Sequence, residues 1–149
     1  MRRTGSCPAC CTAGSSAARS SAEIITDVLI PVARPRQGWS FHEMVRRTSD
    51  FAIVAVAVIV NLAERTGAIA AANVALAGVA DRVVLADPGL TGSAASDAAI
   101  DAAAARIADT LEPADDVHAS GAYRRRLARV LTARALREAS TRAPSGDRA

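Results

Sequence analysis

The sequence predicts an α+β domain, in which a three-stranded antiparallel sheet is followed by packed C-terminal helices. Up to residue 78 the apolar residues form short runs rich in Val and Ile, broken by turn residues, which is typical of strands. From Ser96 the apolar spacing changes to three and four residues, as in helices that bury one face. Strands first and helices afterwards indicate two layers of one α+β fold, and 149 residues suffice for one such domain.

Three neighbouring strands are expected. Residues 39–47 alternate as a half-exposed strand does, and a polar turn follows them. Residues 51–60 are apolar throughout but fall short of the ~20 residues that a transmembrane helix needs. Their β-branched content predicts a strand covered on both faces. A turn at Gly67 precedes the third strand, residues 69–78, and residues 23–32 suit a further short strand.

Two helices follow in the second half of the chain. Residues 96–111 have strong helix formers, Ser96 as the N-cap and acidic residues in the first turn. Residues 121–140 form the second helix, with Ser120 as its N-cap. Its expected buried stripe consists of Tyr123, Leu127, Val130 and Leu131. Because only four residues of the chain are aromatic, the core must consist of Ala, Val, Ile and Leu.

Charge is distributed unevenly along the chain. Residues 81–120 hold eight acidic residues and two arginines, whereas residues 121–149 hold eight arginines and two acidic residues. This asymmetry favours two segments that pair with each other or with a partner subunit. An alternative function is a non-enzymatic interaction module, in which the basic last helix, with Arg124, Arg125 and Arg126, binds an acidic partner or nucleic acid. Stacking aromatics and nucleic-acid motifs are absent from the sequence, which makes nucleic acid the weaker choice.

Cysteine occurs only near the N-terminus, at Cys7, Cys10 and Cys11. The Cys-x-x-Cys spacing suits a redox pair or half a zinc site, but no second pair with ligand spacing follows, so no metal site is predicted. Residues 1–22 have no apolar region of secretory length and are predicted to be a disordered leader. We therefore expect a cytoplasmic protein with reduced thiols.

Four stretches, taken in order, resemble one known family: EIITDVLIP, GWSFHEMVRRTSDFAIVAVAV, ALAGVADR and PADDVHASGAYRRRLARVLTARAL. They resemble the C-terminal domain of the FAD-binding (medium) subunit of molybdenum hydroxylases, the carbon monoxide dehydrogenase and xanthine dehydrogenase family. The resemblance runs from Glu23 to Glu138. It implies an oxidoreductase flavoprotein subunit that takes electrons from molybdenum and iron–sulfur centres on partner subunits and passes them to FAD.

The same resemblance implies two flavin contacts. The family aspartate that touches the flavin falls on Asp50, where a carboxylate can accept hydrogen bonds from ring or ribose donors. Asp50 can equally cap the turn before the strand. A family leucine beside the flavin falls approximately on Leu90, in a segment several residues shorter than the family pattern, and core packing is the alternative for this residue.

No catalytic residues are predicted. Asp116, His118 and Tyr123 invite an acid–base interpretation, but each also suits a structural role around a capped helix, and no nucleophile accompanies them. The family's flavin domain lies before this region and holds the pyrophosphate on Gly-rich turns, none of which precedes Glu23 here. We therefore expect a truncated product, inactive alone, with its domain at residues 23–140, a flexible tail at 141–149 and no tight FAD binding of its own. Its expected partners are the flavin domain and the molybdenum and iron–sulfur subunits.

Overall fold

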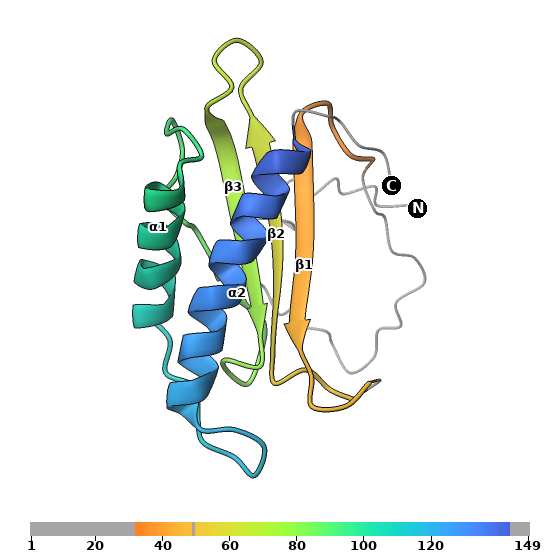
Figure 1. Cartoon of the computed structure of the whole chain (residues 1–149), viewed down its shortest axis with the longest axis vertical. Coiled ribbons are helices and arrows are strands. Elements are labelled where there is room, and N and C mark those ends of the chain that lie inside the picture. The colour runs from red at the N-terminus through yellow and green to blue at the C-terminus, as the bar shows by residue number, and fades with distance from the viewer. Residues whose placement is uncertain (1–31, 49, 144–149) are drawn as a thin grey trace, which may run out of the picture. The chain divides into compact units, whose positions relative to one another are not determined.

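The computed structural model describes residues 32–48 and 50–143 of the chain. Within these residues the strands are β1 (Gln37–Met44), β2 (Val54–Leu62), β3 (Ile69–Ala77) and β4 (Val84–Ala86). They form one antiparallel sheet in the order β1-β2-β3-β4 (Figure 1). The predicted sheet is therefore confirmed, but it has a fourth strand. β4 has three residues, too few for an alternating pattern to show in the sequence.

Two helices complete the fold. They are α1 (Asp97–Asp109) and α2 (Gly121–Arg142). α2 lies across β1 and β2, and α1 packs beside α2 (Figure 1). Both predicted N-caps are confirmed: the hydroxyls of Ser96 and Ser120 accept hydrogen bonds from the third residue beyond them, each at 3.3 Å. α2 extends to Arg142, two residues into the segment predicted as a tail.

The two faces of the sheet differ. The helices bury one face, where Val54, Val56, Val58 and Val60 of β2 lie in the core. The other face, which we call the open face, carries the side chains that alternate with these. It consists of Gln37, Trp39, Phe41, Glu43, Ala55, Ala57, Ile59, Asn61, Ala71, Asn73, Ala75, Ala77 and Leu85. The prediction that β2 is covered on both faces is wrong for the described residues, because Ala57 and Ile59 are exposed.

The core is built from aliphatic residues, as predicted. Trp39, Phe41, Phe51 and Tyr123 are all exposed, and the core cluster consists of Ala, Val, Ile and Leu. Small residues let the layers approach closely. At Gly38 in β1 an added Cβ would overlap the carbonyl oxygen of Ala139 in α2. The helix backbone therefore lies directly on the strand at this point.

The buried stripe of α2 differs from the prediction. Leu127 and Leu131 are buried, but Tyr123 and Val130 are 44% and 48% exposed, so their assignment to the stripe is wrong. Arg124 is buried in place of Tyr123, with 7% of its surface exposed. Beyond Leu131 the buried positions are Thr132, Leu136 and three alanines, and small residues of this kind do not show in a pattern of large apolar residues.

Two expectations concern the membrane and the N-terminal region. None of the helices in the described part of the chain is long and apolar enough to span a bilayer, and residues 54–60 of the apolar run lie in β2. The predicted strand at 23–32 lies outside the described residues except for its last position, Val32. The leader and its cysteines lie wholly outside them.

Candidate functional site

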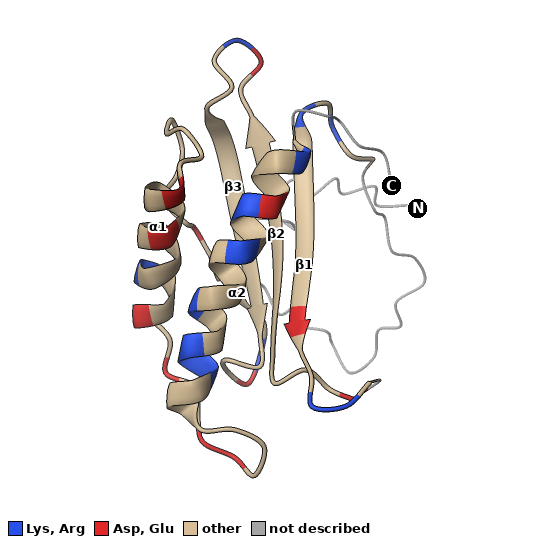
Figure 2. Cartoon of the chain, in the orientation of Figure 1, with Lys and Arg blue, Asp and Glu red and all other residues tan. Residues whose placement is uncertain are grey.

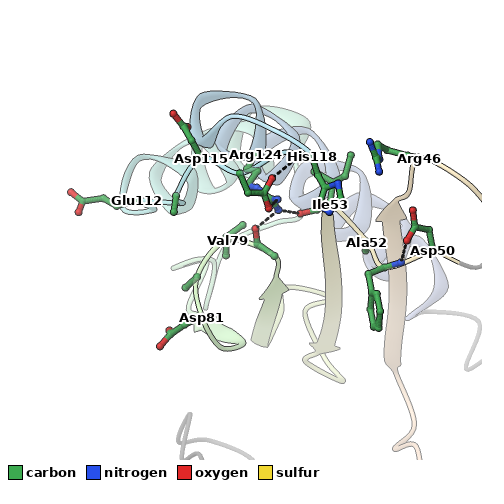
Figure 3. Close-up of a pocket in the computed structure, with 15 residues that line it drawn as sticks. Arg46, Asp50, Ala52, Ile53, Val79, Asp81, Glu112, Asp115, His118 and Arg124 are labelled. Atoms are coloured by element: carbon green, nitrogen blue, oxygen red, sulfur yellow. Dashed lines mark hydrogen bonds and ion pairs between the residues drawn. The ribbon is translucent and has the colours of Figure 1, made fainter.

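A pocket of about 710 Å³ lies at one end of the sheet, and we call it the sheet-end pocket (Figure 3). Its walls come from the segment that enters β2, the turn that leaves β3, and the loop between α1 and α2. Its lining consists of Arg46, Asp50, Phe51, Ala52, Ile53, Gly78, Val79, Ala80, Asp81, Glu112, Ala114, Asp115, Asp116, His118 and Arg124. β2 begins, β3 ends and the loop between α1 and α2 lies at this end of the sheet. Segments far apart in the sequence therefore meet here.

Arg124 connects the three walls of the pocket. One guanidinium nitrogen, Nη1, donates to the carbonyl oxygens of Ile53 at 2.5 Å and Gly78 at 2.9 Å, and Nη2 donates to Oδ2 of Asp116 at 2.5 Å (Figure 3). Gly78 has φ of 77°, and an added Cβ there would overlap the carbonyl oxygen of Ile53. The start of β2 and the end of β3 can therefore come close enough for one arginine to bind both.

Two aspartates fix the loop before α2. Oδ1 of Asp116 accepts the backbone N–H groups of His118 and Ala119 at 2.8 and 2.9 Å. The hydrogen bond from Arg124, followed by these two backbone bonds, holds the pKa of Asp116 well below its ordinary value. Asp115 accepts the N–H of Gly121, the first residue of α2, at 2.5 Å. Asp115 and Asp116 thus hold the loop before α2, and His118 contributes its backbone N–H to this arrangement.

The structure does not bring the two predicted flavin contacts together. Asp50 is exposed at the sheet-end pocket, where its Oδ1 accepts the N–H of Phe51 at 2.8 Å. The turn-capping role of this carboxylate is thus present, and Oδ2 has no protein hydrogen bond among the described residues. Leu90 is 3% exposed, belongs to the core cluster and does not line the pocket.

The lining of the pocket is rich in hydrogen-bond acceptors. Five of its side chains are carboxylates, whereas its cationic side chains are two arginines, of which Arg124 is already bound to Asp116. Such a lining suits the donor groups of a ligand, such as N–H and hydroxyl, and disfavours phosphate. Among residues 32–48 and 50–143 no group of three His, Cys, Asp or Glu side chains is arranged to hold a metal ion.

A second polar cluster joins β1 to the end of α2. Oε2 of Glu138 accepts a hydrogen bond from the Ser40 hydroxyl at 2.6 Å and lies 2.7 Å from Nε2 of His42, and Oε1 accepts from Arg142 at 2.6 Å. The hydrogen bond from Ser40, more than that from His42, lowers the pKa of Glu138. Ser40 is buried, and its hydroxyl and the His42 ring both lie on this one carboxylate, so the cluster ties β1 to the end of α2.

The charge asymmetry of the sequence is explained in part by pairing within the domain. Figure 2 shows acidic residues on α1 and arginines along α2. Arg137 of α2 bonds to Asp97 at 2.6 Å and to Asp101 at 2.7 Å, and these bonds raise its pKa. Arg124 is buried, and Nε of Arg125 donates to the carbonyl oxygen of Leu111 at 2.9 Å. In the alternative function Arg124 and Arg125 bind nucleic acid or an acidic partner. Their bonds within the domain give no support to that function.

Arg124 is the site residue that the sequence reasoning missed. Its signal is present in the spacing: position 124 precedes the buried residues Leu127, Ala128 and Leu131 by three, four and seven residues. An arginine inside such a stripe must find partners for its guanidinium, because an unpaired buried charge is costly. The nearby Asp116 is the partner that the structure provides.

The fold is an α+β domain with a pocket at one end of its sheet. Residues 39–139 match the family described as the CO dehydrogenase flavoprotein C-terminal domain. This match covers more than half of the chain, and the chain therefore belongs to that family. The resemblance noted in the sequence is confirmed.

The relatives support this assignment. The chain is 37% identical over 121 residues to the nicotine 6-hydroxylase medium subunit of Paenarthrobacter nicotinovorans, covering 80% of this chain and 42% of that protein. It is 30% identical over 124 residues to the carbon monoxide dehydrogenase medium chain of Afipia carboxidovorans, with 81% and 42% covered. The chain thus spans about two fifths of the length of these relatives.

Solved structures agree. Quinoline 2-oxidoreductase from Pseudomonas putida 86 superposes with a TM-score of 0.66 at 31% identity, over 74% of this chain and 39% of that one. Carbon monoxide dehydrogenase from Hydrogenophaga pseudoflava gives a TM-score of 0.70 at 28% identity, over 76% and 40%. The α+β fold is therefore shared with part of an oxidoreductase and part of a dehydrogenase.

Proposed function

We propose that the chain serves as the C-terminal domain of an FAD-binding medium subunit of a molybdenum hydroxylase, where it forms one wall of the FAD site. In such a complex FAD accepts electrons that come from molybdenum through iron–sulfur centres. The part of this chain is to bind and orient the flavin and to exclude water. The names of the relatives, which are medium subunits, support the proposal.

The observation that carries the proposal is the acceptor-rich lining of the sheet-end pocket, with Asp50 exposed in it. FAD has hydrogen-bond donors on its ring, its ribityl chain, its ribose and its adenine, and carboxylates can accept all of these. Oδ2 of Asp50 is the acceptor we assign to this contact. Leu90 would act from the core, by supporting the segment before α1, since it is almost wholly buried.

The pyrophosphate of FAD has no comparable site among the described residues. The N-terminus of a helix is the usual place for phosphate, because its free N–H groups point outward. At the start of α2 two of these groups already have partners: Asp115 accepts the N–H of Gly121, and the Ser120 hydroxyl accepts the N–H of Tyr123. On this proposal a separate flavin domain holds the phosphates, and the present domain completes the pocket.

Titration with FAD tests this division of roles. The purified chain alone is expected to bind FAD weakly, because the described residues supply one wall of the site. Tight binding by the isolated chain would contradict the assignment of the phosphates to another domain. Equilibrium dialysis and flavin fluorescence both measure this binding.

A second experiment tests the contact from Asp50. The chain is added to an FAD-loaded flavin domain from a medium subunit, and the rate of FAD dissociation is followed by fluorescence. Addition of the chain should slow dissociation, and Asp50→Asn should reverse part of this effect. Glu64→Gln is the control, because Glu64 is an exposed carboxylate in the turn between β2 and β3, at the other end of the sheet. Equal effects of both variants would refute the role of Asp50.

A further inference from the structure

The outer edge of β1 has no partner strand in the described part of the chain. β1 stands first in the order β1-β2-β3-β4, so its paired edge is the one toward β2. β4, at the other side of the sheet, has three residues, whereas β1 has eight. A long free edge exposes backbone N–H and C=O groups, on which a strand of another molecule can pair. This edge is therefore the place where the sheet can be extended.

The hydrogen bonds around β1 show which of its backbone groups face outward. The carbonyl oxygen of Arg36, just before β1, accepts the N–H of Leu62 in β2 at 3.0 Å. In an antiparallel pair the backbone groups of successive residues point to opposite sides. Even-numbered residues of β1 therefore point toward β2, and odd-numbered residues point away from it. The outward-pointing residues are Gln37, Trp39, Phe41 and Glu43.

Arg142 lies across this edge. It belongs to the last turn of α2, which packs on β1 beside Gly38 (Figure 1). Its Nη1 donates to the carbonyl oxygen of Trp39 at 3.0 Å, and its Nη2 donates to Oε1 of Glu138 at 2.6 Å. Its Cζ also lies 5.1 Å from the centroid of the Trp39 ring, which is on the open face. The side chain therefore passes from the helix side of the sheet around the outer edge to the open face.

This position of Arg142 opposes the addition of a strand. A strand that pairs with the edge needs the Trp39 carbonyl oxygen as an acceptor and the space beside it, and the guanidinium occupies both. A charged side chain on an edge strand is a common protection against such pairing. Glu138, four residues earlier on α2, fixes the guanidinium in place.

A second copy of the chain fits the unguarded edge in an antiparallel register. With a two-fold axis at Ser40, Trp39 lies opposite Phe41 of the second copy, and the next outward pair joins Gln37 to Glu43. Outward-pointing residues then meet each other, as the hydrogen bonds of an antiparallel pair require. Trp39 and Phe41 are 44% and 54% exposed, so both have surface to bury in the aromatic pairs. No like charges lie opposite each other in this register.

We propose that Arg142 guards the outer edge of β1, and that its withdrawal lets β1 pair with β1 of a second copy of the chain. The domain is a monomer while the Arg142 side chain lies across the edge. Once this side chain is removed, two domains join their sheets into one. The guard lies within this domain and does not depend on the role proposed for the sheet-end pocket.

Sedimentation velocity of the full chain tests the guard. The wild-type chain should sediment as a monomer. Arg142→Ala should raise the dimerisation constant about tenfold or more, since pairing no longer displaces a charged donor from the Trp39 carbonyl. Arg129→Ala is the matched control, because Arg129 has the same charge and is exposed in the first half of α2. An Arg142→Ala chain that stays monomeric at every concentration, or a wild-type chain that dimerises equally well, would overturn the proposal.

Amide hydrogen exchange followed by NMR identifies the surface that pairs. The N–H groups of Phe41 and Glu43 should exchange fast in the wild-type chain and become protected in the Arg142→Ala dimer. The N–H of His42 points toward β2 and should be protected in both. A dimer in which Phe41 and Glu43 still exchange fast would overturn pairing through this edge.

Two second-site variants separate the edge from the open face. Phe41→Pro removes an outward N–H and no bond to β2, so the chain with Arg142→Ala and Phe41→Pro should be monomeric. Leu85→Ser changes an apolar residue of the open face on β4, far from β1, and should leave the Arg142→Ala dimer intact. A dimer that survives Phe41→Pro, or that Leu85→Ser abolishes, would overturn the proposal in favour of another contact. Circular dichroism checks that each variant is folded, and the amide exchange decides the contact if the Phe41→Pro chain does not fold.

Discussion

Replacement of Arg124 by methionine should destabilise the domain more than replacement of any exposed arginine. Methionine keeps most of the length of the buried aliphatic stem and removes the guanidinium. The carbonyl oxygens of Ile53 and Gly78 then lose a charged donor, and Asp116 loses its ion pair. The start of β2 and the end of β3 stay paired in the sheet, but the side-chain bonds that tie both of them to α2 and to the loop before it are lost.

The magnitude follows from the burial of each partner. Hydrogen bonds from charged donors contribute about 1.5–3 kcal/mol each, and breaking a buried pair by removing one partner costs about 3–5 kcal/mol. The side chain of Asp116 is 45% exposed, so water replaces much of what this carboxylate loses. We therefore expect most of the loss to come from the two hydrogen bonds to the carbonyl oxygens of Ile53 and Gly78. The free energy of unfolding should fall by about 3–5 kcal/mol.

Urea unfolding followed by far-UV circular dichroism measures this change. Arg126→Met is the matched control, since Arg126 is exposed two residues further along α2, and it should change the free energy of unfolding by less than about 0.5 kcal/mol. A loss below about 1 kcal/mol for Arg124→Met, or equal losses for both variants, would refute the assignment of Arg124 as the residue that joins the three segments.

Three further outcomes are expected. Ser120→Ala removes the N-cap of α2 and should lower the free energy of unfolding by about 1 kcal/mol, measured by urea unfolding. Gly38→Ala should cost about 1–3 kcal/mol or prevent folding, because its Cβ would overlap the Ala139 carbonyl; a stable, soluble variant would contradict that contact. The folded-state pKa values of Asp116 and Glu138 lie below their ordinary values of 3.8 and 4.5, so their stabilisation is present above these values. It is lost as the pH falls below them toward the folded-state values, and Glu138→Gln should flatten the fall in melting temperature below about pH 4.5.

The sequence alone determined most of the local structure. Ser96 and Ser120 were recognisable as N-caps because a cap depends on the few residues around it. The strands and helices also followed from periodicity, and the family followed from motifs in linear order. β4 was missed because three residues pair only when β3 offers its edge, which is a contact between strands and not a local preference.

Tertiary structure decided what each element contacts. An apolar run such as residues 51–60 gives no indication that Ala57 and Ile59 face outward, because both faces of β2 carry apolar side chains. Arg124 appears in the sequence as one of a basic cluster, and only the meeting of two strand ends with the loop at Asp116 gives it buried partners. The physical reason is common to both cases. Propensity and capping act between near neighbours, whereas burial and charge pairing depend on segments brought together by the fold.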